Sequence, residues 1–161
     1  MILIGLGANL PSPAGPPAAT LSGALGRLKQ CGIAILSVSS FYQTPAWPDP
    51  SEPPFVNAVA SVATRLQPAE LLALLHDVEA GFGRVRSRAN APRTLDLDLL
   101  DYDGRILASE IVLPHHRLAE RSFVLMPLAE IAPGWQHPLT RQSAGEMLAN
   151  LPDRDAPKKL A

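Results

Sequence analysis

Apolar residues recur along the chain with two different periods. Alternating or short continuous apolar runs are typical of β-strands, whereas apolar residues three and four apart are typical of helices. These patterns predict strands over residues 2–7, 33–43, 55–65 and 94–102. They predict helices from Thr20 or Ser22 to Gln30, over 69–82, over 121–130 and over 142–151. The order of the first six elements predicts an α+β protein with a ferredoxin-like βαββαβ fold, a mostly antiparallel sheet and helices on one face.

Prolines and turn residues mark the connections between these elements. The segments 9–17 and 44–54 are rich in proline and are expected to be loops. Asp103-Gly104 is a strong turn signal, and we expect a short strand returning from it within 105–113. The chain after 102 forms a C-terminal extension, whose last residues, about 152–161, we expect to be frayed.

Composition narrows the class of protein. A chain of 161 residues with 47% hydrophobic residues fits a single folded domain, here 1–161. A net charge of −1 does not favour binding to nucleic acid or to an anionic membrane. The sequence has no apolar run long enough to span a membrane and no signal-peptide pattern, so we expect a cytoplasmic protein, acting as a monomer. Cys31 is the one cysteine, which excludes an internal disulfide.

Two carboxylates stand two residues apart in the last predicted strand of the βαββαβ unit. Residues at this spacing share one face of a strand, roughly 6.6 Å apart at ~3.3 Å per residue. Asp96 and Asp98 would therefore lie side by side while the leucines between them face the core. Neighbouring carboxylates favour a cation between them, and Mg²⁺ is typically held by one or two carboxylates plus substrate phosphates. The solvated face of an amphipathic strand explains the same pattern.

A cluster of arginines directly precedes this strand: Arg84, Arg86, Arg88 and Arg93. Guanidinium groups stay charged and bind phosphate oxygens in pairs. A metal-bound polyphosphate placed between the carboxylates and the arginines would satisfy both groups. The alternative is that the arginines form ion pairs with the carboxylates of the strand.

Aromatic and histidine residues supply further candidates. Phe55 and Phe123 could sandwich a flat heterocycle, with the amide of Asn57 at its edge, but both rings could equally be ordinary core residues. The adjacent His115 and His116 have no third ligand at zinc spacing, which favours a surface pair, although a role beside phosphates stays open.

Several motifs occur in the order of a known family. The most specific is 92–100 (PRTLDLDLL), supported by 7–10 (GANL), 39–45 (SSFYQTP), 55–58 (FVNA), 114–115 (PH) and 121–128 (RSFVLMPL). From about 3 to 133 the chain resembles the 6-hydroxymethyl-7,8-dihydropterin pyrophosphokinases of folate biosynthesis. The resemblance implies a ferredoxin-like fold with extensions. It also implies the reaction: the terminal pyrophosphate of ATP, the co-substrate, is transferred to the hydroxymethyl group of a reduced pterin, which leaves AMP. Two Mg²⁺ ions are implied as cofactors.

The resemblance also implies a role for particular residues. Those matching the metal ligands are Asp96 and Asp98. Those matching ATP-site residues are Arg84, Arg86, Arg93, His115, Arg121 and Glu79; with the two aspartates, Arg84 and Arg93 would be catalytic. Those matching the pterin site are Phe55 and Phe123 as the aromatic pair, Asn57 at the pterin edge, and Thr44 and Ala46 through backbone groups.

The chain departs from the family in one loop. Many members have Trp-Gly directly before Pro92, where this chain has Asn90-Ala91. The tryptophan of those members closes over the pterin, and whether Trp47 takes its place is open. Two rival functions also stay open: a non-catalytic binding module with the same strand order, and a different Mg²⁺-dependent phosphotransferase.

Overall fold

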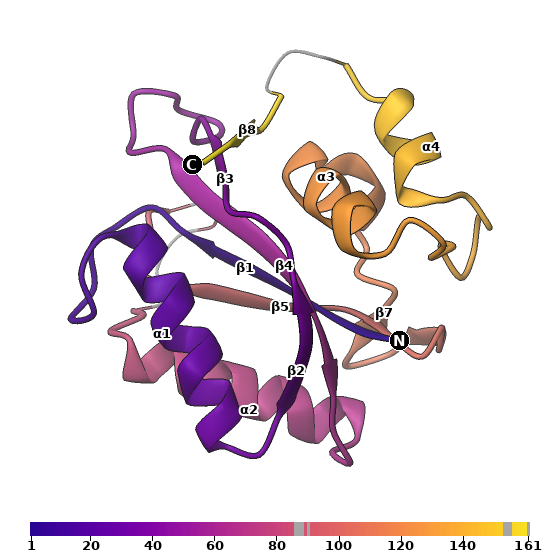
Figure 1. The fold of residues 1–161 in the computed structure, drawn as a ribbon, viewed down its shortest axis with the longest axis horizontal. Helices are drawn as coiled ribbons and strands as arrows, with labels where there is room; N and C mark the ends of the chain where they lie inside the picture. The colour runs from indigo at the N-terminus through magenta and orange to yellow at the C-terminus, as the bar shows by residue number, and fades with distance from the viewer. Residues whose placement is uncertain (86–88, 90, 153–155, 161) are drawn as a thin grey trace.

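A six-stranded antiparallel sheet lies at the centre of this computed structural model, which describes residues 1–85, 89, 91–152 and 156–160. β1 (Ile2–Ala8), all of whose residues are buried, is flanked on one side by β4 (Phe55–Ala63) and on the other by β5 (Asp96–Tyr102). Helices cover both faces of the sheet (Figure 1). The strand order and the antiparallel pairing confirm the predicted ferredoxin-like arrangement.

The predicted strand over 33–43 is two strands, so that prediction of one strand was wrong. β2 (Ala34–Val38) and β3 (Tyr42–Thr44) pair with successive parts of β4. At the break between them, the backbone N–H of Ser39 donates to the Val59 carbonyl at 2.9 Å, and the Ser39 hydroxyl accepts from the Val59 N–H at 3.0 Å. A side-chain oxygen thus replaces one backbone acceptor of the ladder, and the chain can turn without leaving a buried N–H unpaired.

Two helices cover one face, as predicted. α1 (Pro17–Gln30) and α2 (Pro68–Gly81) pack Leu21, Leu28, Leu71 and Leu75 against the apolar side of β1. α1 begins at Pro17 rather than at Thr20 or Ser22, because proline suits the first helical turn.

The C-terminal extension covers the opposite face, so helices are not confined to one side. The 3₁₀ helix η1 (Leu118–Glu120), α3 (Ser122–Ile131) and α4 (Ala144–Ala149) enclose a second core around Leu3, Val59 and Leu100. Figure 1 shows α3 and α4 across the sheet from α1 and α2. None of the helices in the described part of the chain is long and apolar enough to cross a membrane.

Two short pairings differ from expectation. β6 (Leu107–Ala108) pairs with β7 (Val112–Leu113), so the segment after the turn folds on itself instead of returning along β5. β8 (Lys158–Lys159) pairs with β3, beside which it lies in Figure 1, so these two residues are not frayed. Residues 153–155 and 161 of the same tail lie outside the described residues.

Gly7 allows a close approach between strands. It lies between Asn57 of β4 and Asp96 of β5 in the sheet register, and a Cβ atom at this position would lie 2.8 Å from Asn57 Oδ1.

We predict that Gly7→Ala lowers the free energy of unfolding by about 1–3 kcal/mol, measured by urea denaturation, because Asn57 must move. The control is Gly26→Ala inside α1, where an added Cβ meets nothing within 4 Å and should stabilise by up to about 1 kcal/mol. Equal stability of Gly7→Ala and wild type would contradict this prediction.

Candidate functional site

A cavity of about 280 Å³ opens where the sheet meets the start of α3. A much smaller recess of about 20 Å³, bounded by Asp96, Asp98 and Phe123, lies beside it. The cavity is lined by Gly7, Thr44, Pro45, Trp47, Phe55, Asn57, Arg93, Asp96, Arg117, Glu120, Arg121, Ser122 and Phe123.

Strand register brings together residues that are far apart in the sequence. Gly7 of β1 lies opposite Asn57 on one side and Asp96 on the other, and Thr44 of β3 lies opposite Phe55. Because cross-strand neighbours share a face, the candidate heterocycle-binding residues and the first carboxylate reach one cavity.

Two phenylalanines from different layers form walls of the cavity. Phe55 starts β4 and Phe123 lies in the first turn of α3, and both are half-buried. A guanidinium carbon lies 5.5 Å from each ring centroid, that of Arg93 over Phe55 and that of Arg121 over Phe123. Phe123 also packs against the second core. The rings are therefore both cavity walls and neighbours of cations, rather than ordinary core residues.

Polar groups at the floor of the cavity are held by one another. The Asn57 side-chain amide, which is buried, donates to the Thr44 hydroxyl at 3.0 Å. Ala46 is buried but does not line the cavity, although its neighbours Pro45 and Trp47 do.

The two carboxylates of β5 differ in their partners. Asp96 accepts from Arg84 Nη1 at 3.1 Å and from Arg93 Nη1 at 3.0 Å, one arginine on each oxygen. Burial alone would raise the pKa of Asp96, but the charges of Arg93 and Arg84 outweigh it and lower that pKa. Among the described residues, Asp98 has a long contact of 3.8 Å to Arg121 as its one ion pair, and burial together with the neighbouring Asp96 raises its pKa to about 7.

The ion pairs on Asp96 match the alternative interpretation of the arginine cluster. Arg84 and Arg93 do pair with the strand carboxylate Asp96. This does not exclude phosphate binding, because a guanidinium group can exchange a carboxylate for a phosphate with the same fork geometry. Arg86 and Arg88 lie outside the described residues.

Glu79 lies behind the site rather than in it. Its carboxylate, on α2, is buried and accepts from the Leu97 N–H at 2.8 Å. Arg84 Nη1 lies 3.5 Å from the same oxygen and donates to the Leu95 carbonyl at 2.9 Å. Glu79 therefore holds both the strand and the arginine.

His115 lies beside the site but does not line the cavity. The backbone N–H of His115 donates to the Leu100 carbonyl at 2.9 Å, and its ring Nδ1 accepts from the backbone N–H of Arg117 at 3.2 Å. Burial, helped by the charges of Arg121 and His116, lowers the pKa of His115 to about 4, so the ring is neutral at pH 7. The two histidines stack with centroids 4.8 Å apart.

Sequence reasoning missed two connecting residues. Asn9 is buried and joins the two loops that flank the cavity: its Nδ2 donates to the Pro53 carbonyl at 3.0 Å, and its Oδ1 accepts from the Arg93 N–H at 2.8 Å. Arg117 has its guanidinium carbon 5.7 Å from the ring centroid of the exposed Trp47. Asn9 stood within the 7–10 motif, but only its contacts show a role.

The acidic pair fits a hard cation that is shared with a substrate. Both carboxylates are half-buried on one face of β5, and the raised pKa of Asp98 reflects its burial and a neighbouring like charge that a cation would offset. Among the described residues, no group of three or more His, Cys, Asp or Glu is arranged to hold a metal ion. Mg²⁺ commonly takes one or two carboxylates and completes its shell with phosphate and water.

Aromatic walls for a flat ring, next to cations and an acidic pair, define a site for group transfer from a phosphorylated donor to a heterocycle. Comparison with known proteins then identifies the family. The family model described as 7,8-dihydro-6-hydroxymethylpterin-pyrophosphokinase matches residues 3–133, and the chain belongs to this family.

Individual relatives agree with this assignment. A 2-amino-4-hydroxy-6-hydroxymethyldihydropteridine pyrophosphokinase of Methylorubrum extorquens is 44% identical over 132 residues, which are 81% of each chain. One of Synechocystis is 41% identical over 138 residues, covering 84% of this chain and 68% of the relative. The crystal structure of Plasmodium falciparum HPPK-DHPS superposes with a TM-score of 0.71 at 13% identity, over 92% of this chain and 40% of the other. The last likeness shows the shared fold.

The raised pKa of Asp98 predicts a pH dependence of stability. Between its ordinary value of 3.8 and about 7, the folded metal-free chain keeps this proton while the unfolded chain loses it. Wild type should therefore lose stability relative to Asp98→Asn as the pH rises from about 5 to 7, by at most about 1.4 kcal/mol per pH unit. Urea unfolding in the presence of a chelator measures the difference. A difference that does not vary with pH would show that Asp98 ionises normally.

Proposed function

We propose that this cavity is where the chain, with ATP and Mg²⁺, transfers pyrophosphate to 6-hydroxymethyl-7,8-dihydropterin and releases AMP. The family assignment gives the reaction, a step of folate biosynthesis. The observation that carries the choice of site is that Phe55, Phe123 and Asp96 line one cavity. A ring held by the two phenylalanines would thus present its substituent to the phosphates beside the acidic pair.

The pterin lies between Phe55 and Phe123 in this proposal. Offset or edge contacts between flat rings stabilise such a sandwich. The Asn57 amide, already fixed by Thr44, offers its carbonyl oxygen and a second N–H to the pterin edge. Backbone groups at Thr44 meet the same edge, whereas Ala46, matched to the same role by the family motif, does not line the cavity.

The triphosphate lies along the arginines. Arg84 and Arg93 release part of their contact with Asp96 and bind phosphate oxygens, with Arg121 and the neutral His115 nearby. Glu79 keeps Arg84 in place during this exchange. We assign Arg86 the same role from its position in the family motif.

Asp96 and Asp98 would hold the magnesium, two ions in this proposal. When bound, magnesium supplies charge neutralisation and Lewis-acid polarisation of the phosphates. The proton on Asp98 must leave before this carboxylate can bind a cation, and the positive charge of Arg121 favours that ionised form.

In the reaction, the hydroxymethyl oxygen forms a bond to the β-phosphorus and releases its proton to solvent. The bond from that phosphorus to the oxygen bridging to the α-phosphate breaks, and AMP leaves with the electron pair. Arg84 and Arg93 stabilise the negative charge that accumulates on the phosphate oxygens in the transition state. Closure of the loops beside the cavity, which Asn9 joins, would exclude competing water.

The products provide the direct test of this function. After one turnover with ATP, Mg²⁺ and 6-hydroxymethyl-7,8-dihydropterin, chromatography should show equal amounts of AMP and diphosphorylated pterin. Asp96→Asn should lower turnover by at least about 100-fold with the fold intact, because it loses a metal ligand and charge. ADP with a monophosphorylated pterin would instead identify an ordinary kinase.

The aromatic wall predicts a selective binding defect. Phe123→Ala should weaken pterin binding by about 10- to 100-fold, since stacking on one ring contributes about 1–3 kcal/mol. Binding of a non-hydrolysable ATP analogue should change by less than about threefold, because the triphosphate lies on the arginines. Calorimetric titration measures both affinities, and Phe123→Tyr, which keeps the ring, is the control. Equal losses for the two ligands would point to a general core role.

A further inference from the structure

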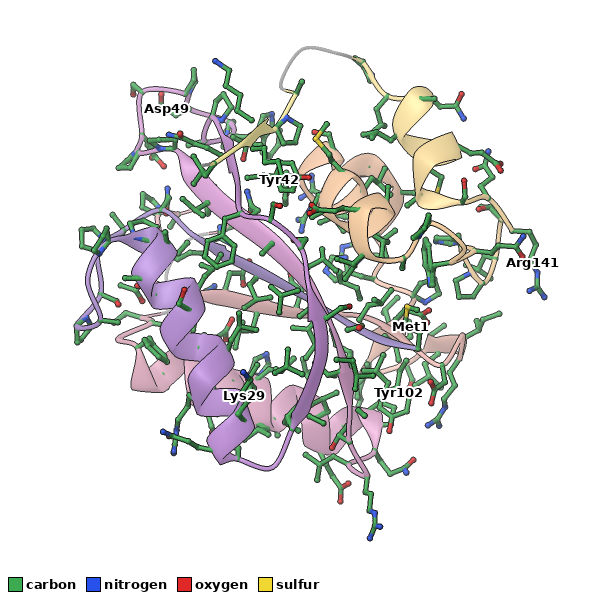
Figure 2. All side chains as sticks on the ribbon, viewed as in Figure 1. Met1, Lys29, Tyr42, Asp49, Tyr102 and Arg141 are labelled. Carbon is green, nitrogen blue, oxygen red and sulfur yellow. The ribbon has the colours of Figure 1, made fainter. Side chains whose placement is uncertain are left out.

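A second polar cluster lies outside the cavity, at the C-terminal end of α3. The Glu130 carboxylate accepts from the Tyr42 hydroxyl at 2.6 Å, from the Ser40 hydroxyl at 2.7 Å and from the Ser40 N–H at 3.1 Å. Lys159 Nζ of β8 lies 3.8 Å away. Figure 2 shows Tyr42 in the space between β3 and α3. We call these residues the Glu130 cluster; it joins β3, α3 and β8.

The charge state of the cluster makes its hydrogen bonds strong. Burial alone would raise the pKa of Glu130, but the bonds from Tyr42 and Ser40 lower it overall. Burial and the neighbouring carboxylate raise the pKa of Tyr42 to about 12. At neutral pH a charged acceptor therefore faces neutral donors, an arrangement roughly twice as strong as a neutral pair.

The cluster connects the two walls of the cavity. Glu130 follows Phe123 by seven residues on α3, nearly two helical turns, so both lie on the same face of the helix. Tyr42 precedes Thr44 by two residues on β3 and lies opposite Asn57 in the sheet register. One carboxylate thus fixes the helix that carries one wall against the strands that carry the other.

Directional bonds add to the apolar packing of α3. The helix packs through Val124, Leu125 and Leu128 on the second core, and the hydrophobic effect itself is non-directional. Pro127 lies inside the helix and lacks the N–H that would bond the Phe123 carbonyl. Hydrogen bonds elsewhere on α3 therefore contribute to the rotation and height of Phe123 over the sheet.

We propose that Glu130 is a positioning residue for the pterin, acting through β3 and α3 without touching the substrate. It sets the separation between the Phe123 wall and the wall formed by Phe55 and Asn57. This inference rests on the proposed function. Lys159 connects the Glu130 cluster to the C-terminal tail, which lies beyond the residues matched by the family model.

The test separates the pterin site from the ATP site. Glu130→Gln should weaken pterin binding by about tenfold or more, because the amide cannot accept every bond that the carboxylate accepts. Affinity for a non-hydrolysable ATP analogue, and the single-turnover rate at saturating pterin, should stay within about threefold, because the arginines and the acidic pair are untouched. Calorimetry and rapid quench measure these quantities.

Tyr42→Phe provides a second route that preserves the ring packing. If the two residues act through one interaction, the double variant with Glu130→Gln should lose less pterin affinity than the two single losses combined. The tyrosine variant also keeps the test decisive if Glu130→Gln does not fold.

Trp135→Phe is the matched stability control. It removes the 2.8 Å hydrogen bond from Trp135 Nε1 to Asp101 Oδ2 in the second core, and Trp135 does not line the cavity. It should lower stability while leaving pterin affinity unchanged.

Three results would overturn the inference. The first two are parallel losses of pterin and ATP affinity in Glu130→Gln and a pterin defect of the same size in Trp135→Phe. Unchanged pterin affinity in both Glu130→Gln and Tyr42→Phe would overturn it as well. Product analysis of wild type comes first. Failure there would reject the proposed function, whereas normal products with unaltered binding by the variants would reject only the positioning role.

Discussion

The register of β1 against its two neighbours determines where every part of the site lies. Gly7 faces Asn57 across one ladder and Asp96 across the other, and it has no side chain to separate them. A one-residue slip in either ladder would turn the neighbouring strand over and send its polar residues into the apolar core. The buried apolar residues of β1 oppose such a slip, so the same packing that stabilises the fold aligns the heterocycle wall with the acidic pair.

The charged groups of the site balance one another. Asp96 is shared by two arginines, while Asp98 keeps a raised pKa because burial and Asp96 disfavour its ionised form. In the proposed function, metal and triphosphate would supply new partners to both sides at once: phosphates for the arginines and cations for the carboxylates. The ion pairs of the arginine cluster are therefore compatible with the phosphate binding that we propose.

The sequence predicted the element order, the antiparallel sheet and most of the cavity lining, because these follow from apolar periodicity and from motifs that are local in the chain. It did not predict the break at Ser39, since a hydroxyl standing in for a backbone acceptor leaves no trace in periodicity. The placement of α3 and α4 on the second face, the Asn9 link between two loops and the Glu130 cluster were missed for a related reason. Each depends on contacts between residues more than 40 positions apart, which spacing along the chain does not reveal.

The break between β2 and β3 also concerns the edge of the sheet. β2 and β3 together form one margin of the sheet, and an open margin of unpaired N–H and C=O groups invites strand addition and aggregation. β8 covers β3 with two lysines, and a register irregularity between Ile35 and Ser37 distorts β2. The short tail strand therefore occupies the hydrogen-bonding groups of β3 and places two exposed lysines where an approaching strand would have to dock.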